Sequence, residues 1–342
     1  MDPLALTRRL VDVESITGNE ATVGELLIRE LGALGFDAHK MPVPFPAEIA
    51  AAGRERFNVY ASGRVDRPDI VFSTHMDTVP PFIPSREDET RIYGRGSCDA
   101  KGIMAAQIAA AVRLRDEGMR VGLLYVVGEE RDSLGAQVAN QHSLRPRFLI
   151  NGEPTDNRLA LASKGSLRLQ LTATGRMAHS AYPELGESAI DKLLDALQAL
   201  RSMPLPVNPE VGPATLNIGL IEGGRAPNVV PDSASAQLQY RLVGPSDGLR
   251  RDIETAVASK AKAEFVLEIP FVKLRTVDEL PTMVAAYTTD IPNLTNWGEP
   301  LLLGPGSIHV AHTDGEYIEK VQLLEAVELY CRVARKLLAL SS

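Results

Sequence analysis

The chain has 342 residues, of which 44% are apolar and 23% are charged, as in ordinary folded globular proteins. This length exceeds what one hydrophobic core usually organises and predicts two domains, while the net charge of −8 argues against a basic surface for nucleic acid. Two cysteines are too few for a disulfide framework or a thiolate zinc module, which favours a reducing, cytoplasmic compartment.

A membrane partner is not expected either. The first 20 residues contain Arg8, Arg9, Asp12 and Glu14, where a secretory segment would need an unbroken apolar core. The longest weakly polar stretch, 102–114, is well short of the ~20 residues that a membrane-spanning helix requires. A small molecule is therefore the expected partner.

The first half of the chain alternates helices and strands. Apolar residues at intervals of three and four predict two helices within 4–34, separated at Gly18. Further apolar runs predict strands at 57–62, 69–74, 121–127 and 148–150, and helices at 100–115 and 133–141. This alternation predicts an α/β fold with a mostly parallel sheet and flanking helices.

From Lys164 the pattern changes to strict alternation of apolar and polar residues, which is typical of a strand with one wet face. The predicted order is strand 164–172, helix 187–201, strands 215–221 and 234–242, helix 249–262 and strand 264–269. This order describes a smaller, ferredoxin-like α+β domain at 164–274. A strand at 301–303 and a helix at about 317–340 then complete the first domain, which is expected to be discontinuous, at 1–163 and 275–342.

Histidines and carboxylates follow the predicted strands of the first domain. His75 and Asp77 come after the strand that begins at 69, Glu129 and Glu130 after 121–127, and Glu153 after 148–150. Because the carboxyl ends of parallel strands meet at one edge of a sheet, these side chains are expected to converge. Nitrogen and carboxylate ligands suit zinc, with cobalt or manganese as substitutes.

Each motif also has a simpler interpretation when taken alone. Asp77 can reach the imidazole of His75 because strand residues two apart point to the same side, but a buried His–Asp pair would look the same. Asp99 lies in a glycine-rich loop and could merely cap the following helix, although the loop lacks the Gly-Lys-Ser/Thr ending of a phosphate-binding loop.

The two adjacent carboxylates Glu129 and Glu130 repel one another unless cations or protons compensate, although an exposed loop remains an alternative. Glu153 lies in an Asn-Gly-Glu-Pro turn, which is unremarkable by itself. Cys98 is interpreted as a packed residue.

In combination, ordered motifs resemble the dinuclear zinc hydrolases that comprise acetylornithine deacetylase, succinyl-diaminopimelate desuccinylase, aminoacylase and related carboxypeptidases and dipeptidases. The resemblance runs through nearly the whole chain. It is carried by His75-Met76-Asp77, Gly94 through Gly102, Glu129-Glu130, Asn151 to Pro154, Ala178 to Pro183, Gly223 to Pro231, and Ala311-His312-Thr313 to Glu316.

The resemblance implies roles for individual residues. His75, Asp99 and Glu153 would hold one zinc, and Asp99, Glu130 and His312 the other. Glu129 would be the general base, Asp77 the orienting carboxylate, and His179 a donor to the tetrahedral intermediate that reaches across a homodimer. Matched positions for substrate binding are Asn228, Arg241, Gly304, Gly306 and Ser307, and Arg225 could also bind a carboxylate. His309 is assigned to loop packing.

The implied activity is hydrolysis of an N-acylated amino acid by a zinc-activated water, with acetylornithine-type deacetylation, and hence arginine biosynthesis, as the expected case. A metallo-dipeptidase or carboxypeptidase on the same scaffold is the alternative, followed by a non-catalytic binding protein. The small domain is expected to serve as a lid and as the dimerisation domain.

Overall fold

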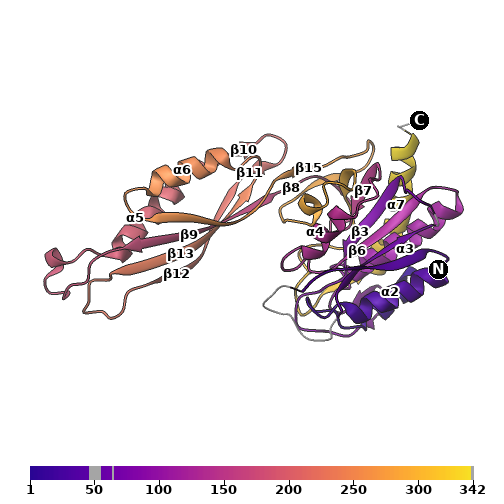
Figure 1. Ribbon diagram of the computed structural model, residues 1–342, viewed down its shortest axis with the longest axis horizontal. Coiled ribbons are helices and arrows are strands. Elements are labelled where there is room, and N and C mark those ends of the chain that lie inside the picture. The colour runs from indigo at the N-terminus through magenta and orange to yellow at the C-terminus, as the bar shows by residue number, and fades with distance from the viewer. Residues whose placement is uncertain (46–54, 64, 340–342) are drawn as a thin grey trace. The chain divides into compact units, whose positions relative to one another are not determined.

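The computed structural model describes residues 1–45, 55–63 and 65–339 (Figure 1). The chain forms two compact units. The larger unit comprises Met1–Leu161, Leu274–Met283 and Thr289–Ser342, and the smaller unit comprises Ala162–Lys273 and Val284–Thr288. The sequence had placed the smaller domain at 164–274 alone. Residues 284–288 join it because the backbone N–H of Lys164 donates to the carbonyl of Ala285 and the Ser163 hydroxyl donates to that of Tyr287.

The larger unit is built on a six-stranded sheet in the order β1-β2-β6-β3-β7-β17. The strands are β1 (Asp37–Pro42), β2 (Phe57–Ser62), β3 (Ile70–His75), β6 (Val121–Val126), β7 (Phe148–Asn151) and β17 (Glu299–Leu302). β3 runs parallel to β6 and β7, and β17 runs parallel to β7, whereas β1 and β2 are antiparallel additions. Since β2, β3, β6 and β7 are buried along their whole length, the apolar runs of the sequence form the centre of the sheet.

Helices cover both faces of this sheet. The main core packs the sheet against α1 (Pro3–Val11), α2 (Ala21–Ala33), α3 (Lys101–Asp116) and α7 (Lys320–Ala339). A second cluster joins the sheet to α4 (Leu134–Gln141) and to the fully buried Trp297. Helix α3 is buried almost throughout, and its alanines allow close packing against the strands. No helix in the described part of the chain has both the length and the apolar character needed to cross a bilayer.

Short strands complete the larger unit. β4 (Arg86–Glu87), β5 (Arg91–Tyr93) and β18 (Tyr317–Glu319) form one small sheet. The prediction of a helix from about 317 was wrong by three residues, because Tyr317–Glu319 pairs with β5 before α7 begins at Lys320. A short helix, η2, spans Ile291–Asn293. A further three-stranded sheet contains β15 (Val272–Lys273), which belongs to the smaller unit, together with β8 (Leu159–Ser163) and β16 (Thr282–Ala285), whose residues are divided between the two units.

The smaller unit has the strand and helix order of a ferredoxin-like domain. Its elements are β9 (Gly165–Thr174), α5 (Ala189–Ser202), β12 (Thr215–Gly223), β13 (Ser233–Leu242), α6 (Asp247–Val257) and β14 (Lys262–Ile269), with η1 (Pro183–Leu185), β10 (Val207–Asn208) and β11 (Gly212–Pro213) in the connections. The antiparallel sheet runs β12-β13-β9-β14, and α5 and α6 lie on one face of it (Figure 1). Helix α6 ends before the predicted residue 262, because Lys262 already pairs with β9.

Candidate metal centre

The carboxyl ends of the parallel strands bring together the side chains that the sequence singled out. His75 is the last residue of β3, Glu129 and Glu130 follow β6, and Glu153 follows β7. Asp99 lies just before α3, and His312 lies in the loop after β17. Ligand atoms of three sets lie within 4.8 Å of one another, namely His75, Asp99 and Glu153; Asp99, Glu130 and His312; and His75, Glu129 and Glu130.

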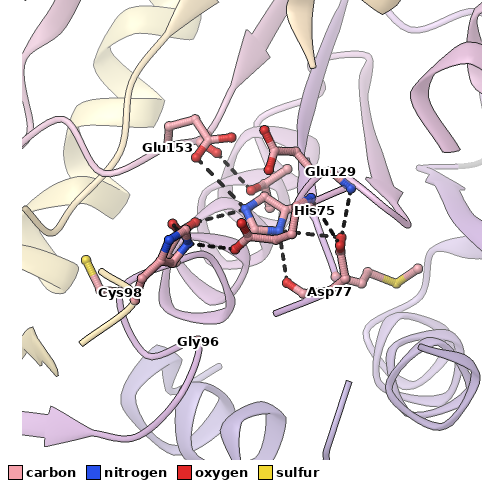
Figure 2. Close-up of polar contacts among 12 residues, drawn as sticks. His75, Asp77, Gly96, Cys98, Glu129 and Glu153 are labelled. Atoms are coloured by element: carbon pink, nitrogen blue, oxygen red, sulfur yellow. Dashed lines mark hydrogen bonds and ion pairs between the residues drawn. The ribbon is translucent and has the colours of Figure 1, made fainter. Parts of the chain in front are cut away.

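His75 lies at the centre of the first set. Its Nε2 is 2.9 Å from Asp99 Oδ1 and 3.9 Å from Glu153 Oε2. Its Nδ1 is 3.0 Å from the backbone carbonyl of Asp77, on the opposite side of the ring from Glu153 (Figure 2). Because Nδ1 donates to this carbonyl in the neutral imidazole, Nε2 is left as the nitrogen with a free lone pair, as a metal ligand requires.

Asp77 differs from its expected arrangement. Its carboxylate oxygen is 3.7 Å from Nδ1 of His75, too far for a good hydrogen bond, and the backbone carbonyl takes that place. The buried carboxylate instead accepts the backbone N–H of Glu129 at 3.1 Å, that of Glu130 at 3.2 Å, and the hydroxyl of Thr17 at 2.8 Å. Asp77 therefore orders the turn that carries the two glutamates.

Asp99 connects the two main sets. While its Oδ1 faces His75, its Oδ2 is 3.4 Å from Nε2 of His312. The same Nε2 lies 2.9 Å from Oε1 of Glu130. One buried carboxylate thus has one oxygen directed at each histidine, which is the arrangement of a group that bridges two cations.

Burial and neighbouring charges shift the pKa values of these groups in opposite directions. Burial, followed by the charge of Glu153, raises the pKa of Glu129 well above its usual range, and burial also raises that of Glu153. Burial opposes ionisation of Asp99, but hydrogen bonds from His312 and His75 outweigh it and lower its pKa. Hydrogen bonds to Asp99 and Glu130 raise the pKa of His312 to about 10. Carboxyl groups therefore outnumber the imidazoles at this site, and their combined negative charge favours the binding of cations.

Gly304 and Gly306, in the loop after β17, were matched to substrate-binding positions, but their backbone N–H groups are already engaged within the protein. Gly304 N donates to Thr155 Oγ1 and Gly306 N donates to Gln322 Oε1, each at 2.9 Å. A Cβ at Gly304 would lie 2.4 Å from the carbonyl oxygen of Glu153, and one at Gly306 would lie 2.5 Å from Cys98 Sγ. The two glycines therefore let the loop pack against the segments that carry Glu153 and Asp99.

Other expected residues are distributed more widely. Ser307 is partly buried and its carbonyl accepts from Cys98 Sγ. His309 is exposed and belongs to none of the three sets, which agrees with the expectation that His312 and not His309 is the ligand, although the exposed side chain does not pack within the loop. The sequence does not indicate a role for Glu316 beyond its place in the last motif, yet its carboxylate accepts the backbone N–H of Asp99. The hydroxyl of Thr17 donates to the carboxylate of Asp77, and no sequence motif predicted this contact.

Four of the expected residues belong to the smaller unit. His179 is exposed, and its Nδ1 accepts the backbone N–H of Ala181 at 3.1 Å. Asn228 is exposed and lies beside the same turn, since its carbonyl accepts the N–H of Ser180. Arg225 forms two hydrogen bonds with Asp232, each of 3.0 Å. Arg241 is half-buried and makes no ion pair with any described residue.

Comparison with known proteins gives a consistent assignment. Residues 161–267 match the M20 family model for a peptidase dimerisation domain. A protein of Aspergillus terreus named a probable carboxypeptidase is 41% identical over 96% of this chain and 84% of its own length. A protein of Schizosaccharomyces pombe named as containing a peptidase M20 domain is 37% identical over 96% of this chain and 83% of its own length.

Solved structures share the fold. An aminopeptidase PepT from Bacillus cereus superposes with a TM-score of 0.80 at 20% identity, covering 98% of both chains. A Bacillus subtilis protein described as a dinuclear metal-binding peptidase of the M20 family superposes with a TM-score of 0.67 at 15% identity, covering 97% of this chain and 96% of its own.

The α/β unit with clustered metal-binding side chains, joined to a ferredoxin-like unit, defines an enzyme of the metallopeptidase type. On the identity and coverage of its curated relatives, the chain belongs to the M20 peptidase family.

Proposed function

We propose that the protein is a dinuclear zinc carboxypeptidase that removes the C-terminal residue from a short peptide or dipeptide. The observation that carries this proposal is the carboxylate of Asp99, which faces His75 with one oxygen and His312 with the other. The name of the Aspergillus terreus relative favours peptide cleavage. The expected acetylornithine-type deacetylation and its role in arginine biosynthesis find no such support.

The side chains present fit two divalent ions. One ion would be held by His75, Asp99 and Glu153, and the other by Asp99, Glu130 and His312. Imidazole and carboxylate ligands favour zinc, and cobalt or manganese could replace it. When bound, the ions would act as Lewis acids on the scissile carbonyl and on a water molecule.

Glu129 is the group proposed to move the proton. Its raised pKa makes it a stronger base than an ordinary carboxylate, so it can take a proton from the water that attacks the carbonyl carbon. As the C–N bond breaks, Glu129 returns this proton to the departing nitrogen. The carboxylate of Asp77 accepts the backbone N–H of Glu129 at 3.1 Å and so fixes the position of the Glu129 backbone.

His179 is proposed to donate a hydrogen bond to the oxygen that becomes negative when the water adds. Since Nδ1 already accepts from Ala181, the neutral ring carries its proton on Nε2, which is then a donor. The resemblance implies that this histidine acts in the partner of a homodimer, and its unit matches a peptidase dimerisation domain. We therefore propose a homodimer formed through the smaller unit.

Arg241 is the proposed partner of the substrate's terminal carboxylate. A guanidinium binds a carboxylate through two parallel hydrogen bonds. Arg225 is less suitable because its Nε–Nη2 edge is already paired with the carboxylate of Asp232. Burial lowers the pKa of Arg241, so a substrate anion would relieve the cost of keeping its charge half-buried.

The test is a substrate panel for the zinc-loaded and cobalt-loaded protein. Dipeptides and short peptides with free C-termini are compared with C-terminally amidated copies, acetylornithine and other acetylated amino acids. Release of the C-terminal amino acid is expected only from peptides with a free carboxylate. Arg241→Lys should raise KM about 10-fold or more, since the paired hydrogen bonds are lost. Turnover of acetylornithine alone would refute the carboxypeptidase assignment and restore the deacetylase.

A further inference from the structure

The most densely bonded side chain beside the candidate metal centre belongs to Glu316, which is not one of the proposed ligands. It lies four positions after His312 and is 1% exposed. Its Oε1 accepts the backbone N–H groups of Gly96, Cys98 and Asp99 at 3.0, 3.0 and 3.1 Å. The loop that presents Asp99 is therefore folded around a carboxylate from the segment that carries His312.

The second oxygen of Glu316 pairs with Arg95. Nη1 of Arg95 donates to Oε2 of Glu316 at 2.7 Å and to the carbonyl of Thr313 at 3.2 Å. Both charged side chains are nearly inaccessible, at 2% and 0% exposure. Thr313 follows His312, whose φ of +63° lies in the left-handed region that favours glycine, so surrounding contacts must hold this backbone.

We infer that the Glu316–Arg95 ion pair is a positioning device that sets the separation of Asp99 and His312, and thereby the affinity for the cation held by Asp99, Glu130 and His312. The inference rests on the proposed metal centre. Two of that cation's three ligands, Asp99 and His312, belong to the joined segments. Of the three ligands proposed for the other cation, His75, Asp99 and Glu153, only Asp99 belongs to the joined segments. The affinity for that cation should therefore change much less.

A purely electrostatic influence predicts a different outcome. Removing the negative charge of Glu316 would weaken cation binding by Coulomb's law, whereas removing the positive charge of Arg95 would strengthen it. Positioning predicts that both changes weaken the same metal site, because either one releases the two segments from each other. The two explanations therefore predict opposite changes in cation affinity when the charge of Arg95 is removed, and this variant distinguishes them.

The experiment titrates Co²⁺ into metal-free wild-type protein, Glu316→Gln and Arg95→Met, following heat and visible absorption. Two binding steps are expected for the wild type, and in both variants one step should lose roughly 10–100-fold in affinity, the effect typical of groups that orient ligands. Arg95→Lys keeps the charge and folds more readily. Its single Nζ cannot also replace the Nε of Arg95, which donates to the carbonyl of Pro81 at 3.3 Å, so it should weaken the same step to an intermediate degree.

Asp88→Asn is the matched control. The exposed Asp88 accepts the backbone N–H groups of Thr90 and Arg91, each at 2.8 Å, in a turn that carries no proposed ligand. Its loss should leave both Co²⁺ affinities unchanged. Unchanged affinities in Glu316→Gln, tighter binding in Arg95→Met, or wild-type affinities in Arg95→Lys would overturn the inference while leaving the metal centre standing. A wild-type protein without two-step uptake would overturn both.

Discussion

At the scale of single residues, Glu129 combines the properties of a proton carrier. The residue is partly exposed, while burial of its carboxyl group, together with the nearby charge of Glu153, raises its pKa. Its backbone is held by Asp77, whose carboxylate takes the N–H groups of both glutamates. A single buried carboxylate thus fixes the base and a proposed ligand together.

Glu129→Gln should therefore abolish turnover without removing the metal. Glutamine keeps the size of the side chain but cannot accept a proton, so kcat should fall by roughly 10²–10⁴-fold, the usual contribution of general acid–base catalysis. Metal analysis of the purified variant should still find two ions per chain. If metal and activity disappear together, Glu129 is a ligand and not the base.

Metal uptake near pH 7 should release protons because of His312. Its pKa of about 10 means that the imidazole is protonated in the metal-free protein, whereas a ligand nitrogen must be neutral. Apparent metal affinity should therefore rise as the pH increases from 7 toward 10. Titration calorimetry in two buffers of different ionisation enthalpy measures the protons released. His312→Asn should release fewer, and equal heats in both buffers for the wild type would contradict the prediction.

At the scale of secondary-structure elements, the site depends on how closely loops approach one another. The loop after β17 places Gly304 against the turn after β7, where the carbonyl oxygen of Glu153 leaves no room for a Cβ. Close approach, and not a free N–H group, explains the glycine at this position.

Gly304→Ala should destabilise the larger unit by about 1–3 kcal/mol, the typical effect of overpacking. The backbone of Glu153 must move, so metal affinity should also fall. Urea unfolding of the metal-free protein and Co²⁺ titration measure the two effects. Gly32→Ala is the control, because Gly32 lies in α2 with nothing within 4 Å of an added Cβ and alanine should stabilise the helix by about 0.5–1 kcal/mol. Equal stability of both variants would refute the packing argument.

Elements that are buried and continuous could be predicted from the sequence, and elements defined by distant pairing could not. β2 and β6 coincide closely with their apolar runs. β1 is polar and mostly exposed, and β18 has only three residues, so both exist because of their partners β2 and β5. Residue types at strand ends predicted the cluster, but the contacts of Asp77 could not follow from strand periodicity, because β3 ends at His75.

At the scale of the whole molecule, each unit has its own hydrophobic core. The clustered proposed ligands all belong to the larger unit. Without cations, the carboxyl groups of Asp99, Glu153 and the neighbouring glutamates can share the site only if some of them take up protons, as the raised pKa of Glu153 indicates, so cation binding should stabilise the larger unit.

Chelation should therefore lower the stability of the larger unit alone. At a free metal concentration 100 times Kd, each occupied site stabilises the native state by about 2.7 kcal/mol through mass action. Scanning calorimetry should show one metal-dependent transition and one that EDTA leaves in place. Leu238→Ala, in the core of the smaller unit, should reduce the free energy of unfolding of that unit by ~2–5 kcal/mol. The transition that moves to lower temperature in this variant is then the one that belongs to the smaller unit. If EDTA shifts both transitions equally, the units unfold together and stability cannot be assigned to them separately.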